Sequence, residues 1–307
     1  MTLFYLFKAL RPRQWLKNVS LYGALFFWGS LFDYQQFTQA TKAFIIFCCL
    51  SSSMYLINDL VDINKDRLHP FKKMRPLAAG KVGVNTARLT ALILLVLGLS
   101  WSFSLDRYFF IISLTFVILE ISYSFFLKRM IIVDALTVAT AFILRFYAGS
   151  LAIHVSLSSW LVLTTIGVSL LLAFGKRRSE RTLLAAYHLP NETRETLKHY
   201  PDTLLDSMIS MSASFAIITY ALFTFQVSSK AYVPFLATIL PPSLARPKWM
   251  MLTILLAIYS VARYLYIIYE KKEGESPERV IFSDKPLLVS VALWGFAVLT
   301  IIYGLGD

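Results

Sequence analysis

Charged residues are scarce in this chain. Lys, Arg, Asp and Glu make up 16% of its 307 residues, whereas about a quarter of a typical soluble domain is charged. Hydrophobic residues make up 57%. They recur in runs of about 20 residues, the length that spans the hydrocarbon core of a bilayer. The runs are continuous rather than alternating, which predicts membrane helices and excludes a β-barrel. We therefore expect an all-α, polytopic membrane protein.

Cysteine is almost absent as well. Cys48 and Cys49 are adjacent inside an apolar run, where neighbouring thiols are poorly placed to form a disulfide. The chain has no cysteine spacing typical of zinc. It also shows no cleavable signal peptide, since Leu31-Phe32-Asp33-Tyr34 follows the first apolar run. The longest interruptions of the apolar pattern, 59–84 and 176–205, are too short for a soluble domain, so we expect one integral-membrane domain over residues 1–307.

Nine apolar segments are predicted to cross the membrane. They are 18–34, 39–58, 85–104, 108–127, 131–151, 158–175, 206–226, 249–269 and 286–305. Lys and Arg gather before the first segment and in the loops after the second, fourth, sixth and eighth, as they do in cytoplasmic loops. This bias predicts a multi-pass protein of the cytoplasmic (inner) membrane, with its N-terminus in the cytoplasm and its C-terminus outside. The net charge of +12 then serves topology, anionic lipid and phosphate substrates rather than nucleic acid.

An acidic group stands where the second segment meets the cytoplasm. Its members are Asn58, Asp59, Asp62 and Asp66. If the stretch is helical, Asn58, Asp62 and Asp66 share one face over about 12 Å, given a rise of roughly 1.5 Å per residue. Oxygen ligands this close together favour a hard cation such as Mg²⁺, which usually carries substrate phosphates too. The alternative is a solvated helix end with acids placed by chance.

Basic residues follow the acids directly. Those predicted to hold phosphate are Arg67, Lys72 and Arg75. Lys offers phosphate a point charge, and Arg offers a fork of donors. His69, between them, is either structural or a hydrogen-bond donor to a substrate. An ordinary basic loop is the alternative, but a cationic strip beside a metal site is what a diphosphate needs.

Two further clusters stand at the expected cytoplasmic ends of other segments. One comprises Tyr123, Lys128, Asp134 and Arg145, and the other comprises Lys176, Arg177 and Glu180. Arg145 lies deep in an apolar run. A charged side chain there costs free energy, so it is taken as a functional residue by default. Its expected partner is Asp134 or a substrate phosphate, and a structural ion pair between helices is the alternative. Arg263 is another buried cation, without an obvious partner. Asp206 and Asp284 are expected to cap helices, and a place in the metal shell is the alternative.

These motifs together resemble the UbiA superfamily of intramembrane prenyltransferases, whose first acidic motif is similar to the stretch from Asn58 to Asp66. Other stretches resemble one subgroup, the decaprenyl-phosphate phosphoribosyltransferases. They are Arg11-Pro12-x-Gln14-Trp15-x-Lys17-Asn18, Tyr123-Ser124-x-x-Leu127-Lys128, Leu144-Arg145-x-x-Ala148-Gly149, Gly175-Lys176-Arg177-Arg178-x-Glu180 and Asp284-Lys285-Pro286. The superfamily's usual second motif, Asp-x-x-x-Asp, is incomplete, because Asp134 is followed by Val138 at the second position.

The resemblance implies a nine-helix bundle with a cytoplasm-facing cavity. The implied reaction moves a 5-phosphoribosyl group from 5-phosphoribose 1-diphosphate (PRPP) to a polyprenyl monophosphate, releasing diphosphate, toward lipid-linked donors for cell-wall polysaccharide. Asn58, Asp59, Asp62 and Asp66 would hold Mg²⁺, and Asp59, Asp62 and Arg75 would serve catalysis. The implied substrate-binding residues are Lys17, Asn18, Arg67, Lys72, Arg75, Tyr123, Lys128, Asp134, Arg145, Lys176 and Arg177.

The resemblance also suggests a homo-oligomer, specifically a trimer. Two other functions remain open at this point. One is an aromatic prenyltransferase of the same fold, with a polyprenyl diphosphate as donor. The other is a transporter for a lipid phosphate or an anion, which would need charged residues along a path to both membrane faces.

Overall fold

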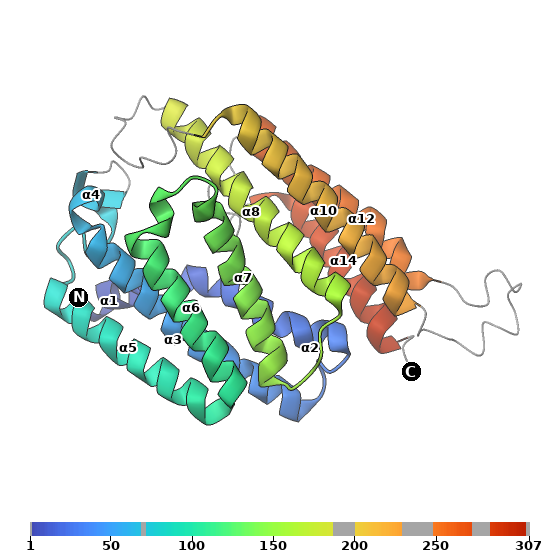
Figure 1. Cartoon of the computed structure of the whole chain (residues 1–307), viewed down its shortest axis with the longest axis horizontal. Coiled ribbons are helices and arrows are strands. Elements are labelled where there is room, and N and C mark those ends of the chain that lie inside the picture. The colour runs from blue at the N-terminus through green and yellow to red at the C-terminus, as the bar shows by residue number, and fades with distance from the viewer. Residues whose placement is uncertain (1, 69–71, 187–199, 229–247, 272–282, 305–307) are drawn as a thin grey trace, which may run out of the picture. The chain divides into compact units, whose positions relative to one another are not determined.

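The computed structural model describes residues 2–68, 72–186, 200–228, 248–271 and 283–304 (Figure 1). Every regular element within these ranges is a helix, as expected. Within them the chain divides into two compact units, one running to Ser156 and the other starting at Leu157. His69 lies outside the described residues, as do residues 187–199 of the interruption that follows the sixth apolar run.

Eight helices of the described residues are long and apolar enough to cross a membrane. They are α3 (Tyr34–Val61), α5 (Val84–Leu105), α6 (Arg107–Phe125), α7 (Val133–Ala152), α8 (Ser159–Ala186), α10 (Asp202–Ser228), α12 (Trp249–Tyr266) and α14 (Lys285–Gly304). They correspond in order to the last eight predicted segments. The all-α, multi-pass membrane architecture is therefore confirmed.

The first predicted segment, 18–34, is not one continuous helix. After the short α1 (Thr2–Ala9), the chain forms the 3₁₀ helix η1 (Pro12–Leu21) and then α2 (Tyr22–Trp28), which ends at Gly29 with a positive φ of 86°. At roughly 2.0 Å per 3₁₀ residue and 1.5 Å per α residue, η1 and α2 together measure about 30 Å. That length matches the hydrocarbon core of a bilayer, about 30 Å. The first predicted segment is thus formed by two helical pieces whose summed length is close to the thickness of the hydrocarbon core.

In the first unit, α3 is the central helix. It packs against η1, α5, α6 and α7, and its Phe47 contacts Phe109 and Phe116 of α6 at ring-centroid distances of 5.8 and 5.1 Å. The Trp15 indole donates a hydrogen bond to Ser52, at 2.9 Å, and so fastens η1 to α3. On the other side of η1, a Cβ added at Gly149 of α7 would collide with the backbone of Leu21. Glycine there lets the two backbones touch.

Short elements at one end of the first unit carry polar side chains. Helix α3 ends at Val61, and α4 (Ile63–Leu68) begins after a single residue. The 3₁₀ turn η2 (Lys72–Met74) packs on α4, and another 3₁₀ turn, η3 (Leu127–Arg129), joins α6 to α7. The end of α3 is therefore placed within reach of η3 and of the residues after η2.

The second unit is built from α8, α10, α12 and α14. Gly167 of α8 lies against the backbone of Ala216, where a Cβ would come within 2.8 Å of it, so α8 and α10 pack closely. Helix α12 continues into the π-helix η4 (Ile267–Lys271). Asp284 caps α14, because its carboxylate accepts the Leu287 backbone N–H at 3.0 Å. The prediction that Asp284 caps a helix is therefore confirmed.

Candidate active site

The acidic group divides into two pairs, each bridged by a cation. Lys128 bridges Asn58 and Asp62, whereas Arg75 bridges Asp59 and Asp66. The single shared face expected for Asn58, Asp62 and Asp66 is not observed in that form. Asp62 ends α3 with a φ of −96° and a ψ of 6°, and this break in the helix lets Asp66 face Asp59 instead.

Lys128 joins two clusters that are separate in the sequence. Its Nζ lies 2.7 Å from each carboxylate oxygen of Asp62 and 3.4 Å from the Asn58 side-chain oxygen. Asp62 is partly exposed, and Lys128 is mostly covered. The turn η3 thus delivers a cation to the acids at the end of α3, as a converging active site requires.

Two arginines hold the second pair of acids. Arg75 donates to Asp66 at 2.5 Å and to Asp59 at 3.1 Å, and Arg11 donates to Asp59 at 2.5 Å. Asp59 is 3% exposed and Asp66 is 4% exposed, so both charges depend on these arginines, because a buried charge is tolerated only when it is paired.

Arg11 is absent from the residues that sequence reasoning assigns to the site. Its backbone is left-handed, with φ 56° and ψ 60°, a costly conformation for a residue other than glycine. Its guanidinium also lies over the ring of Tyr55, 5.3 Å from the centroid. Its position before Pro12, at the start of the stretch from Arg11 to Asn18 noted in the sequence, is the signal that could have found it.

Deeper in the first unit lies a second polar group around Arg145. The Arg145 Nε donates to the Asn18 side-chain oxygen at 2.8 Å, and its Nη1 donates to the Ala141 carbonyl at 2.9 Å. Asn18 is fully buried and also donates to Cys48. Arg145 stacks on Phe116, 4.6 Å from the ring centroid. Both Asn18 and Arg145 were predicted as substrate-binding residues, and here they bind each other.

The ion-pair partner of Arg145 is Glu120 of α6, not the expected Asp134. The closest approach, between Nη2 and the carboxylate, is 4.0 Å, and the charge of Lys17 acts on the same carboxylate. Sequence reasoning overlooked Glu120, although an acid inside a predicted membrane segment is itself a signal of function. Lys17, Glu120 and Arg145 thus form a mixed-charge group within the membrane-spanning part.

The remaining predicted residues of the first unit vary in burial. Asp134 is fully buried in the first turn of α7. Lys72 and Tyr123 are partly buried, one in η2 and the other near the end of α6, whereas Arg67 is exposed. Of these four residues, Arg67 is therefore the one whose side chain is exposed to solvent.

Lys176 and Arg177 lie in the second unit and share an acid. Glu180, which the sequence groups with them, is 2.5 Å from Arg177 and 3.9 Å from Lys176. Arg177 is 1% exposed. Its side chain is therefore part of the packed interior of this unit.

Two expectations for the second unit change. Arg263, which has no evident partner in the sequence, makes a two-point pair with Asp284 at 3.0 and 2.9 Å. Asp206 does not cap a helix, because α10 begins at Asp202 and Asp206 sits a turn further on. Asp206 instead accepts a hydrogen bond from Arg178 at 2.8 Å.

The acids of the first unit fit a magnesium ion by the chemistry of their donors. Among the described residues, no three His, Cys, Asp or Glu side chains lie close enough together to hold a metal ion. Mg²⁺ usually needs only one or two carboxylates, with water and substrate phosphates completing its octahedron. The pairs Asn58–Asp62 and Asp59–Asp66 both supply oxygen ligands of this kind.

Comparison with known proteins identifies the family of this chain. The model of the UbiA prenyltransferase family matches residues 19–186. The chain belongs to this family. Among curated UbiA-type relatives, a decaprenyl-phosphate phosphoribosyltransferase of Corynebacterium glutamicum is 31% identical over 96% of this chain and 86% of its own length. The enzyme of that name from Mycolicibacterium smegmatis is 32% identical over 94% of this chain and 89% of its own.

A solved UbiA structure shares the fold. A UbiA homologue from Archaeoglobus fulgidus, bound to DMAPP and Mg²⁺, superimposes with a TM-score of 0.69. It covers 97% of this chain and 99% of its own, at 22% identity. At this identity the match shows that the chain has the UbiA fold, in agreement with the helical architecture described above.

Proposed function

We propose that this UbiA-family protein transfers a 5-phosphoribosyl group from PRPP to a polyprenyl monophosphate. The observation that carries the proposal is the match to two decaprenyl-phosphate phosphoribosyltransferases over more than nine-tenths of this chain. The bond between C1 of the sugar and the diphosphate breaks, and a new bond forms from C1 to an oxygen of the lipid phosphate. Diphosphate leaves, so the step is a pentosyl transfer.

The two bridged pairs, which comprise three acids and the Asn58 amide, provide the diphosphate site. Asn58, Asp59, Asp62 and Asp66 would hold Mg²⁺, which neutralises charge on the leaving diphosphate when bound. Lys128 and Arg75 already lie on these acids. With Arg11, which pairs with Asp59, three cations balance the three carboxylates before substrate arrives, and Lys128 and Arg75 would also contact phosphate oxygens. Lys72 and Arg67 extend the positive strip from the next elements.

The acceptor needs little help from a base. A phosphate monoester carries between −1.5 and −2 charges at neutral pH, so its oxygen is already nucleophilic. What it requires is positive charge that offsets its own and holds it near C1. The candidates in the first unit are Lys17 and Arg145, with Asn18 and Tyr123. For Lys176 and Arg177 of the second unit, phosphate binding stays a prediction from the sequence.

The incomplete second motif favours a sugar diphosphate over a prenyl diphosphate as donor. Asp134 is buried in α7, and Val138 stands one turn later where a second acid would complete the motif. A second acidic pair is therefore lacking at this place in α7, which weakens the reading of a prenyl diphosphate held between two metal groups. PRPP is water-soluble and comes from the cytoplasm, which suits the predicted cytoplasmic placement of the end of α3.

The proposal includes an orientation in the inner membrane. The lysine and arginine bias supports a cytoplasmic N-terminus and an outer C-terminus. A single membrane domain in a homo-oligomer, with a trimer suggested by the family, remains part of the proposal. Its product would enter the synthesis of lipid-linked pentose donors for cell-wall polysaccharide.

Membranes that contain the full chain test the substrates directly. We expect them to move radioactivity from labelled PRPP into a lipid extract when polyprenyl phosphate and Mg²⁺ are both added, and not when Mg²⁺ is chelated. A parallel reaction receives a labelled prenyl diphosphate and an aromatic acceptor. Transfer in the parallel reaction alone would make the protein a prenyltransferase, and uptake of the anion without turnover would make it a transporter.

A further inference from the structure

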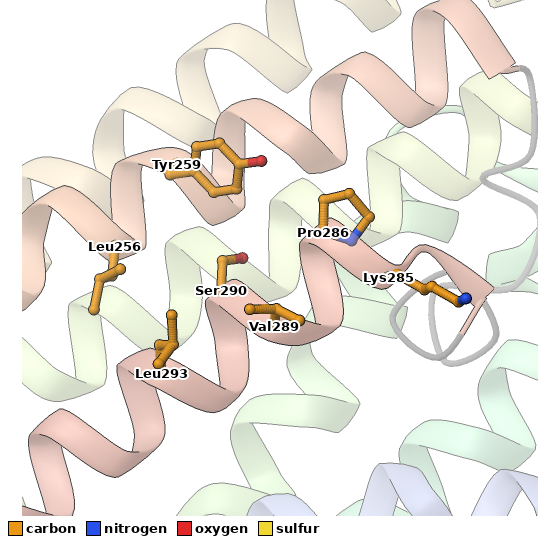
Figure 2. A pocket seen from close by; sticks show the side chains of 7 residues that line it. All are labelled: Leu256, Tyr259, Lys285, Pro286, Val289, Ser290 and Leu293. Carbon is orange, nitrogen blue, oxygen red and sulfur yellow. The ribbon is translucent and has the colours of Figure 1, made fainter.

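A shallow apolar groove lies between α12 and α14 in the second unit (Figure 2). Its volume is about 480 Å³. Leu256 and Tyr259 line it from α12, and Val289 and Leu293 line it from α14. Ser290 forms part of its floor, since it is 4% exposed and lies 3.0 Å from the Ser260 hydroxyl, a hydrogen bond that joins the two helices.

A lysine stands at one end of this groove. Figure 2 shows Lys285 at the start of α14, with Leu256 and Leu293 at the opposite end. Lys285 is exposed, and it is the only charged residue among those described as lining the groove. The neighbouring Asp284 is engaged by both guanidinium nitrogens of Arg263. Among the described residues, Asp284 is therefore paired with Arg263, and Lys285 presents its charge at one end of the apolar groove.

We propose that this groove binds one anionic phospholipid of the bilayer. Its phosphodiester would lie at Lys285, and one acyl chain would lie along Val289 and Leu293. From Lys285 to Leu293, nine residues in all, the helix rises about 12 Å, enough to hold the upper part of one chain. The other side of the chain would be covered by Leu256 and Tyr259.

The single cation selects the type of headgroup. A phosphodiester carries one negative charge and is matched by one lysine, whereas a phosphate monoester carries nearly two and suits sites with several cations. The end of α14 that bears Lys285 is also the end expected at the cytoplasmic surface, where anionic lipid attracts basic residues. This proposal does not depend on the reaction proposed above, because none of the groove residues belongs to the catalytic group.

Native mass spectrometry of the full-length protein in detergent tests the proposal. Phosphatidylglycerol is the anionic probe, and phosphatidylcholine is the neutral probe. We expect the wild type to retain one phosphatidylglycerol in preference to phosphatidylcholine. Lys285→Ala should weaken this binding about fivefold, the effect expected of one lysine near a membrane surface. Leu293→Trp, which fills the groove, should abolish retention of that lipid.

Leu255→Trp is the matched control, because Leu255 is 72% exposed on α12 and does not line the groove. It should retain the lipid like the wild type. Unchanged binding in Lys285→Ala, or equal retention in the Leu293 and Leu255 variants, would overturn the proposal. So would polyprenyl phosphate that displaces phosphatidylglycerol at equal concentration. Should Leu293→Trp fail to fold, Val289→Trp tests the same occlusion.

Discussion

At the scale of single residues, the candidate site is a balance of buried charges. Three aspartates at the end of α3 and in α4 would repel one another, and three cations from separate elements hold them: Arg11, Arg75 and Lys128. The three acids lie within eight residues of the sequence and could be predicted as a group. Their partners are distant along the chain, so which cation meets which acid could not be predicted.

Arg11 combines an unusual backbone with an ion pair, and two substitutions separate these features. Arg11→Gly and Arg11→Ala both remove the guanidinium from Asp59, and both should lower phosphoribosyl transfer strongly. Only alanine bears the cost of the left-handed conformation, so the glycine variant should be more stable by about 1 kcal/mol. Thermal unfolding in detergent measures the difference. Equal stability of the two variants would show that the positive φ is not retained.

Asn18 connects Arg145 to α3, and its loss should destabilise the first unit. Asn18→Ala leaves the buried Arg145 Nε without its acceptor, which costs about 1–3 kcal/mol. We expect a lower melting temperature than for Val19→Ala, a control at a neighbouring residue that is 47% exposed. If the two variants have the same melting temperature, the hydrogen bond contributes little to stability, and the role of Asn18 is confined to substrate binding.

At the scale of elements, the membrane-spanning helices were predictable, and the irregular elements between them were not. The apolar runs predict eight helices to within a few residues at most ends, because a membrane allows little else over that length. The break at Asp62 and the 3₁₀ form of η1 depend on tertiary contacts that no local pattern encodes. These irregular places are also where the polar side chains of the site converge.

The close contact between η1 and α7 gives a prediction at this scale. Gly149→Ala would drive a methyl group into the backbone at Leu21, and we expect a loss of about 3 kcal/mol from overpacking. Gly295→Ala in α14 is the control, because a Cβ there meets nothing within 4 Å and alanine favours the helix. Thermal unfolding of both variants measures the loss of stability. A Gly149→Ala protein as stable as the Gly295→Ala control would contradict the close contact between η1 and α7.

At the scale of the whole molecule, the number of crossings decides where the two termini lie. Eight crossings would leave both on one side, and nine would separate them. Since η1 and α2 together are about as long as a bilayer core is thick, we expect nine crossings. A reporter at the C-terminus should be reached by an impermeant reagent from outside, and one at the N-terminus should not. If both termini are labelled from the same side of the membrane, η1 and α2 do not cross it.

The central claim is that the acids at the end of α3 hold the sugar diphosphate through Mg²⁺, and one measurement tests it most directly. Transfer from labelled PRPP to polyprenyl phosphate is compared for the wild type, Asp62→Ala and Asn64→Ala, an exposed neighbour in α4. We predict that Asp62→Ala abolishes transfer while the protein still melts cooperatively, and that Asn64→Ala transfers normally. Transfer by folded Asp62→Ala protein near the wild-type rate would contradict the account.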